Sequence, residues 1–293
     1  MELRVFGKNP LEVSVLGYGA GAIGDPSVSE KECEHLLNSI VDAGINLIDT
    51  ARSYGLSEER IGRHLKNRRK DVVLSTKIGY GIPGYQDWTP PMIEGGVDQA
   101  LRLLQTDCID IVHLHSCPLE TLKKDGIIDA LERAAKAGKV RVPAYSGDNE
   151  PFEWALNSGR FDGLQTSINI CDQRAIPSAK KAAERGIGVI AKRSLANAPW
   201  RNVPPPGNDQ AAAEYKLRWQ KMALELPVSE AAAIALRFVA YLPGVHSCLV
   251  GSSNLQHIRE NLEFIKQGPL PQETVEKIRS AFDSHGTLWA GQI

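Results

Sequence analysis

Ile-Asn-Leu-Ile-Asp-Thr-Ala-Arg-Ser-Tyr, at residues 45–54, is a short apolar run that closes on an acidic residue and then a tyrosine. The run 45–49 is too short for a helix, and its near-continuous hydrophobicity is typical of a parallel strand buried on both faces. Similar runs recur on both sides of it. We therefore expect eight strands, at residues 14–17, 45–49, 72–76, 109–114, 140–145, 163–167, 188–191 and 247–250.

Helical patterns occupy the intervals between these runs. The first begins after Ser29, and Glu32 stands three residues on, which is the spacing of a capping box. Glycine or proline borders the others, as is usual at helix ends. We expect helices at residues 30–43, 122–137, 177–185 and 229–241.

Alternating strands and helices predict an α/β protein with a parallel sheet. Eight such units in 293 residues fit one closed (β/α)8 barrel, the TIM barrel, and we expect a single domain over residues 1–293. Gly7 and Asn9 are turn residues within the first ten positions, so we also expect a short β-hairpin before the first barrel strand.

Charge and cysteine content narrow the class of protein. The chain has 34 Lys and Arg against 35 Asp and Glu, a balance that argues against nucleic acid or an acidic membrane surface as partner. None of the five cysteines forms a Cys-x-x-Cys pair, which favours reduced thiols over disulfides or a zinc site. With no apolar run of signal-peptide or membrane-spanning length, we expect a cytoplasmic protein, and we make no prediction of its oligomeric state.

Polar side chains stand where predicted strands end, and in a barrel these ends carry the active site. Asp49 ends the second strand, and Tyr54 comes five positions later. Lys77 follows the third strand and His115 follows the fourth. Taken alone, an Asp and a Lys at this end could form a purely structural ion pair. The four together point to catalysis.

The chain resembles the aldo-keto reductase family in three segments, Asp49-Thr50-Ala51-x-x-Tyr54-Gly55-x-Ser57-Glu58, Ser75-Thr76-Lys77 and Asp110-x-x-x-x-His115. The resemblance runs over nearly the whole chain. It implies an NADPH-dependent enzyme that reduces the carbonyl of a small aldehyde or ketone, or oxidises an alcohol in reverse, with NADH as a possible cofactor. Some proteins similar to this family are NADPH-binding regulatory subunits with little catalysis, and that alternative stays open.

Reducing a carbonyl requires a hydride at carbon and a proton at oxygen. Free tyrosine has a pKa of about 10, too high for a good proton shuttle near neutral pH. Because a buried ammonium stabilises tyrosinate, we expect Tyr54 to donate the proton, Lys77 to tune it and Asp49 to hold Lys77. His115 is expected to donate a hydrogen bond to the substrate oxygen. This chemistry requires no metal.

Loops after the seventh and eighth strands of barrels often bind phosphate groups. Ser253 and Gln256 have capping-box spacing, so we expect a helix to begin there, with Asn254, His257 and Asn261 on one face. By resemblance, the nicotinamide amide is held by Ser146 and Gln165. The residues expected at the cofactor are Gly19, Ala20, Ser146, Gln165, Lys192, Arg193, Ser194, Leu195, Gly251, Ser252, Ser253, His257 and Asn261.

The chain departs from the family pattern at several of these positions. Gly147 stands where many members have Asn, Gly251 where many have Lys, and His257 where many have Arg. Lys192 occupies a position where an aromatic ring often stacks on the nicotinamide. We expect Lys192 and Arg193 to replace part of the missing positive charge.

Aromatic residues of two loops are the candidates for the substrate pocket. Tyr80 and Trp88 lie in the segment after the third strand. Trp200 lies in the Pro-rich segment 196–209, a long loop that we expect to close over the cofactor. These rings indicate an apolar or aromatic substrate.

Two further motifs suggest other functions. Residues 19–24, Gly-Ala-Gly-Ala-Ile-Gly, match the Gly-x-Gly-x-x-Gly fingerprint of Rossmann folds, which requires a helix to begin within the motif. Here Asp25-Pro26 follows and the helix begins after Ser29, so we interpret residues 17–24 as a flexible loop at the barrel mouth. His113-x-His115 could begin a metal site, but no other His ends a predicted strand, and we expect His113 to be a hydrogen-bonded core residue.

Overall fold

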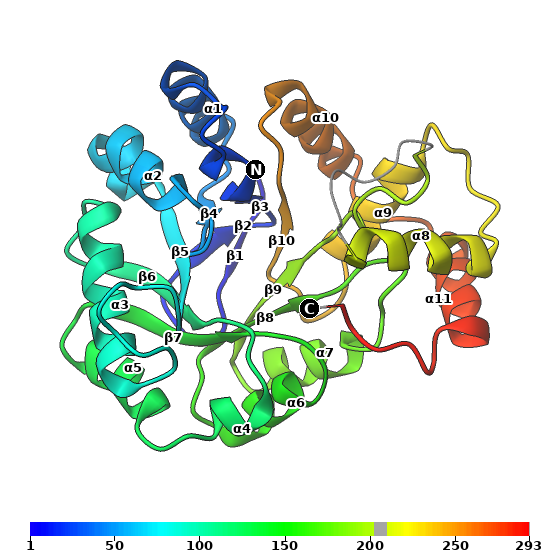
Figure 1. Cartoon of the computed structure of the whole chain (residues 1–293). Helices are drawn as coiled ribbons and strands as arrows, with labels where there is room; N and C mark the ends of the chain where they lie inside the picture. Colours follow the sequence, from blue (N-terminus) through cyan, green and yellow to red (C-terminus); the bar gives the residue numbers. More distant parts are fainter. Residues whose placement is uncertain (202–209, 293) are drawn as a thin grey trace.

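Two sheets are present in the part of the chain that the computed structural model describes, residues 1–201 and 210–292 (Figure 1). The smaller is the antiparallel pair β1 (Leu3–Val5) and β2 (Glu12–Ser14). The larger is a closed barrel of parallel strands in the order β10-β3-β4-β5-β6-β7-β8-β9. The predicted TIM barrel and hairpin are confirmed. The barrel strands are β3 (Leu16–Gly19), β4 (Leu47–Asp49), β5 (Val73–Ile78), β6 (Ile109–Leu114), β7 (Val140–Ser146), β8 (Gly163–Ser167), β9 (Gly188–Lys192) and β10 (Ser247–Val250).

Helices surround the barrel, and Figure 1 shows α10 close to α1 where the ring of strands closes. The capping box of the first helix is confirmed, because Ser29 and Glu32 satisfy each other's backbone N–H groups. The helices are α1 (Glu30–Asp42), α2 (Ser57–Leu65), α3 (Pro90–Leu103), α4 (Leu119–Leu122), α5 (Ile127–Lys136), α6 (Asn149–Ser158), α7 (Ile176–Glu184), α8 (Gln210–Met222), α9 (Ala231–Ala240), α10 (Leu255–Lys266) and α11 (Gln272–His285), with 3₁₀ helices η1 (Ala20–Gly24) and η2 (Lys66–Asp71).

Three expected elements differ from the structure. The helix expected at 122–137 is interrupted, because Gly126 has a φ of +83° and its left-handed backbone separates α4 from α5. The first barrel strand is displaced from 14–17 to β3, since Ser14 pairs within the hairpin. The helix expected to begin at Ser253 begins at Leu255, because the side chain of Asn254 caps it by accepting from the Gln256 N–H.

The glycine motif at residues 19–24 also differs from its interpretation. It is no flexible loop: Gly19 ends β3, and the following residues form η1. A Cβ on Gly24 would stand 1.8 Å from the carbonyl oxygen of Tyr54, so this turn packs directly against the loop that carries the tyrosine. As expected, α1 begins only after Ser29, outside the motif.

The hairpin closes the N-terminal end of the barrel. Phe6 lies in its turn, is fully buried and packs in a separate cluster with inward residues such as Val73 and Ile111. A Cβ on Gly188 would stand 2.4 Å from the Phe6 ring, so β9 begins with glycine where the ring needs the space. The floor is therefore filled by packed side chains, and any site must form at the opposite end.

Part of the predicted long loop, residues 202–209, lies outside the described residues. Across the described ranges, no helix combines the length and the hydrophobicity that a membrane crossing requires.

Candidate active site

A buried ion pair joins the ends of β4 and β5. Lys77 Nζ donates to Asp49 Oδ2 at 2.6 Å and to the Thr50 carbonyl at 2.8 Å. Ser75 Oγ and Gln165 Nε2 both donate to Asp49 Oδ1, at 2.8 and 3.0 Å. Each oxygen of this carboxylate is thus bonded, and its orientation is set by side chains of two other strands, β5 and β8.

Tyr54 lies beside this pair, in the loop between β4 and α2. Lys77 Nζ stands 4.9 Å from the centre of the Tyr54 ring. The loop is held by η1, since the Leu56 N–H donates to the Gly24 carbonyl and the Tyr54 backbone touches Gly24. Burial disfavours the charge on Lys77, but the attraction of Asp49 and Tyr54 outweighs it, and the pKa of Lys77 is raised.

His115 follows β6 and contacts an aromatic side chain. Its Nδ1 lies 2.9 Å from the Tyr80 hydroxyl, and the two rings stack at 5.4 Å. Trp88 packs next to Tyr80, with ring centres 6.0 Å apart. Burial, followed by the positive charges of Lys77 and Lys192, lowers the pKa of His115 to about 3. The imidazole is therefore neutral at physiological pH, and a neutral ring that accepts at Nδ1 donates from Nε2.

His113 lies inside the barrel, two residues before His115. It is fully buried, and its Nε2 stands 3.1 Å from Ser75 Oγ. Burial lowers the pKa of His113 to about 4. The expected role as a hydrogen-bonded core residue is confirmed. Within residues 1–201 and 210–292, no three His, Cys, Asp or Glu side chains gather as a metal site would require.

A cavity of about 720 Å³ opens beside Asp49 and Tyr54. Trp200 lines it and packs against Trp219, away from the predicted partners Tyr80 and Trp88, which lie with His115. The structure therefore does not bring the three proposed substrate-pocket rings together. Of the residues expected at the cofactor, those that line the cavity are Gly19, Gln165, Lys192, Arg193, Ser194, Leu195, Gly251, Ser252, His257 and Asn261.

Three residues expected at the cofactor do not line this cavity. Ala20 is fully buried at the start of η1. Ser146 is buried, and its hydroxyl donates to Gln165 Oε1 at 2.9 Å, so it supports the residue that does reach the wall. Ser253 is exposed just before α10.

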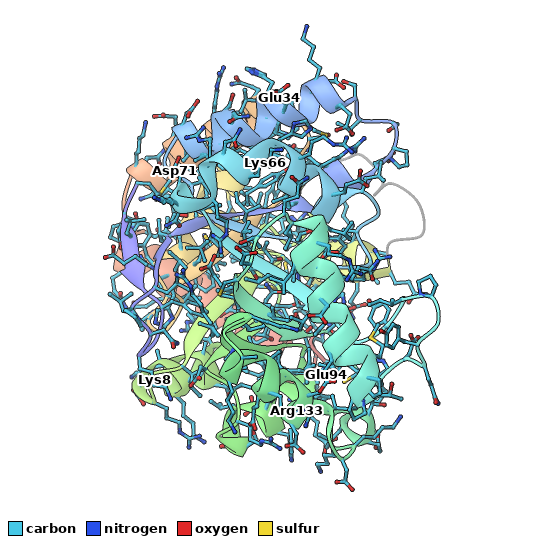
Figure 2. The ribbon with its side chains drawn as sticks, turned by 90° about the vertical axis from the view of Figure 1, so that its left-hand side faces the viewer. Lys8, Glu34, Lys66, Asp71, Glu94 and Arg133 are labelled. Carbon is cyan, nitrogen blue, oxygen red and sulfur yellow. The ribbon has the colours of Figure 1, made fainter. Side chains whose placement is uncertain are left out.

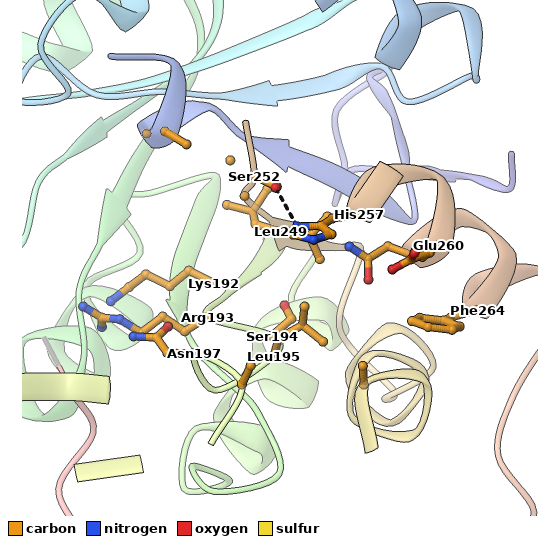
Figure 3. A pocket seen from close by; sticks show the side chains of 18 of the residues that line it. Lys192, Arg193, Ser194, Leu195, Asn197, Leu249, Ser252, His257, Glu260 and Phe264 are labelled. Atoms are coloured by element: carbon orange, nitrogen blue, oxygen red, sulfur yellow. Dashed lines mark hydrogen bonds between the residues drawn. The ribbon is translucent and has the colours of Figure 1, made fainter. Parts of the chain in front are cut away.

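One wall of the cavity is a face of α10 (Figure 3). His257 lies there with its Nδ1 at 3.1 Å from Ser252 Oγ. Glu260 and Phe264 also line this wall and were missed from the sequence. They stand three and seven residues after His257, which is the spacing of a single helix face and a signal that could have identified them.

Lys192 and Arg193 occupy another part of the wall, and Figure 3 shows their charged ends side by side and turned away from His257. Lys192 Nζ donates to Asp148 Oδ2 at 2.6 Å, and Arg193 Nη1 donates to the Gln292 carbonyl. We expected Lys192 and Arg193 to replace part of the positive charge that is missing at Gly251 and His257. In the structure their charged ends are bonded to Asp148 and Gln292 and do not reach the α10 wall. Asp148 was not among the predicted site residues.

Comparisons with known proteins identify the family of this chain. A sequence model of the aldo/keto reductase family matches residues 15–283. An aldo-keto reductase of Bacillus halodurans, solved in its holo form, has a TM-score of 0.81 and 26% identity, with 96% of each chain covered. A probable voltage-gated potassium channel subunit beta of Arabidopsis thaliana is 34% identical over 97% of both chains. L-galactose dehydrogenase of the same plant is 27% identical over 97% of this chain and 95% of its own.

The matched region begins just before β3 and ends within α11, so it contains every barrel strand and every residue of the Asp49, Tyr54, Lys77 and His115 group. Since the match spans most of the chain and the barrel superposes on that of a solved relative, this chain belongs to the aldo/keto reductase family and is an NAD(P)H-dependent oxidoreductase.

Proposed function

We propose that this protein reduces the carbonyl group of a small aldehyde or ketone with NADPH, and that Tyr54 donates the proton. The observation that carries the proposal is the Lys77 ammonium, bonded to Asp49 and 4.9 Å from the centre of the Tyr54 ring. A tyrosine that gives up its proton becomes negatively charged, and a fixed ammonium at this distance stabilises that charge.

His115 complements Tyr54 in the proposal. Its neutral imidazole, with Nδ1 at the Tyr80 hydroxyl, has an Nε2–H that can donate to a carbonyl oxygen. Tyr80 then acts as a positioning residue, because it stacks on the ring that it bonds. Tyr54 and His115 would hold the oxygen of the substrate between them while the bound nicotinamide supplies the hydride to its carbon.

The residues of the cavity fit a nicotinamide dinucleotide. Gly19, Gly21 and Gly251 give the wall stretches without side chains, as a closely approaching ligand requires. Amide and hydroxyl groups line it elsewhere, at Gln165 near Tyr54 and at Ser252 and Asn261 by α10. We propose NADPH as the cofactor because the family favours it, with NADH as the alternative because the α10 wall presents His257 in place of an arginine.

Tyr54→Phe tests the proposal, because it removes the hydroxyl and keeps the ring. We expect kcat for a panel of aldehydes to fall by about 10²–10⁴-fold, the range of general acid catalysis. NADPH affinity, from quenching of tryptophan fluorescence, should change less than about threefold. Tyr85→Phe is the control, since Tyr85 is an exposed tyrosine of another loop. Normal turnover in Tyr54→Phe, with circular dichroism showing a folded protein, would falsify the assignment.

A regulatory subunit that binds the cofactor with little catalysis is the second candidate. Two similar plant proteins, of Arabidopsis thaliana and Oryza sativa, are named as probable potassium channel beta subunits. This candidate predicts tight NADPH binding without turnover of any carbonyl in the panel. Turnover that depends on Tyr54 would exclude it as the main function.

A further inference from the structure

We propose that the substrate of this reductase carries a carboxylate, which Lys192 and Arg193 bind while the carbonyl lies at Tyr54. The inference rests on the proposed function, because it describes the other end of the same substrate. Lys192 and Arg193 line the same cavity as Tyr54 and Gln165, so one bound molecule can reach both ends.

Lys192 ends β9 and has its ammonium held at a fixed point. Nζ donates to Asp148 Oδ2 at 2.6 Å and to Ser167 Oγ at 3.1 Å. Asp148 cannot move to follow a ligand, because its other oxygen accepts from Thr166 Oγ1 and from the Ser167 N–H. An ammonium has three protons, and these bonds use two of them, which leaves one for a ligand oxygen in the cavity.

Arg193 brings a second cation to the same place. Its backbone has a φ of +56°, an unusual conformation for arginine that often marks functional sites. Nη1 donates to Ser167 Oγ at 3.1 Å and to the Gln292 carbonyl at 2.5 Å. Since Ser167 Oγ accepts from both side chains, the two cations are held next to each other, as Figure 3 shows.

Positive charge exceeds negative charge here. Both partners of Arg193 are neutral oxygens, and no carboxylate of the described residues pairs with its guanidinium. The nearby Asp172 is occupied elsewhere: it lies 3.8 Å from Arg218 and accepts from the Gln292 N–H. Of these two cations, only Lys192 has a carboxylate partner among the described residues, Asp148.

The protonation of Lys192 agrees with this imbalance. Burial, together with the repulsion of Arg193 and Lys77, outweighs the attraction of Asp148, and the pKa of Lys192 is lowered. An anionic oxygen placed between the two cations would relieve the repulsion. A carboxylate also matches the planar fork of the guanidinium, which can donate to both of its oxygens.

Matched acids and esters test the proposal. The probes are a 2-oxo acid, a 4-oxo acid and 4-carboxybenzaldehyde, each beside its methyl ester, so that each pair differs in charge and hardly in shape. We expect kcat/KM for at least one acid to exceed that of its ester by about 10- to 100-fold, as charge-assisted hydrogen bonds to a buried cation allow. Arg193→Met and Lys192→Met should each reduce this acid-to-ester ratio by about tenfold or more, mainly through KM.

Arg174→Met is the matched control, because Arg174 is exposed and donates to the Trp289 carbonyl outside the cavity, and it should leave the ratio unchanged. Equal turnover of acids and esters by the native protein would overturn the inference while the proposed reductase function stands. So would a loss of NADPH affinity in Arg193→Met with an unchanged ratio, since the cations would then bind the cofactor diphosphate. Calorimetric titration with 4-carboxybenzaldehyde and its ester decides the question even if no probe is turned over: the acid should bind at least tenfold more tightly.

Discussion

The barrel mouth contains two buried lysine–aspartate pairs that look alike and behave differently. Lys77 with Asp49 and Lys192 with Asp148 have the same Nζ–Oδ2 distance of 2.6 Å, and both carboxylates are almost fully buried. Yet the pKa of Lys77 is raised, whereas the pKa of Lys192 is lowered. Burial lowers both, so the difference comes from the neighbours.

The first pair has a potential anion beside it, and the second has another cation. The attraction of Tyr54 adds to that of Asp49 at Lys77, while Arg193 and Lys77 repel Lys192. The presence of a salt bridge therefore does not by itself indicate the function of its lysine. By this reasoning Lys77 is suited to stabilising charge on Tyr54, and Lys192 is suited to receiving an anion from outside.

The largest expected effect separates the two pairs by activity. Lys77→Met should lower kcat by about 10²–10⁴-fold, because the Tyr54 oxygen loses the charge that stabilises it. Steady-state assays on a neutral aldehyde measure this, and Lys66→Met, at an exposed lysine, should turn over normally. A loss of less than about threefold in Lys77→Met would show that the first pair is only structural.

The second prediction concerns stability. Asp148→Ala leaves the buried Lys192 ammonium without its counter-ion and removes the acceptor of Thr166 and Ser167, so we expect the free energy of unfolding to fall by about 3–5 kcal/mol. Urea denaturation measures the change. Asp162→Ala breaks a surface pair with Lys8 and should cost about 1 kcal/mol or less. Similar losses for the two variants would mean that water reaches the Lys192–Asp148 pair.

The effect expected to be smallest near neutral pH concerns His115, whose pKa both ammonium groups lower. Because its pKa is lowered to about 3, the folded protein keeps this imidazole neutral while the unfolded chain binds a proton below about pH 6.5. Stability from this group is complete above pH 6.5 and is lost as pH falls toward 3, by up to about 1.4 kcal/mol per pH unit. His115→Gln should remove this contribution, as unfolding measured between pH 4 and 7 would show.

Lys192→Met extends the same test. It should raise the pKa of His115, seen by NMR of the imidazole nitrogens, but not to the ordinary value, since burial and Lys77 remain. An unchanged His115 titration would mean that the two pairs do not influence each other through this residue.

Local sequence patterns predicted the structural elements that depend on residues close together in the chain. The eight barrel strands, the capping box of Ser29 and Glu32 and the hairpin all follow from periodicity or short spacing. The breaks in these patterns were harder to predict. Gly126 lies between α4 and α5 and precedes α5 with a left-handed backbone, a conformation that a glycine within a helical pattern does not predict.

The active site shows the same division. The contact between Asp49 and Lys77 was predicted from the sequence, because the two residues lie at the ends of adjacent parallel strands, β4 and β5. Lys192 was predicted at the cavity, but its partner Asp148 lies 44 residues away and beyond the end of β7, and the sequence contains no signal for that contact. Glu260 and Phe264 were overlooked although their helical spacing was visible.

By itself, the sequence of this protein determined the barrel, its closing hairpin and the identity of the residues at the strand ends. It did so because strand and helix periodicity are local properties and because parallel strands all end at one face. Only the tertiary structure decided which charges meet at the second pair, where Lys192 is bonded to Asp148 and repelled by Arg193. The physical reason is that a buried charge responds to every neighbour within a few ångströms, and those neighbours come from distant parts of the chain.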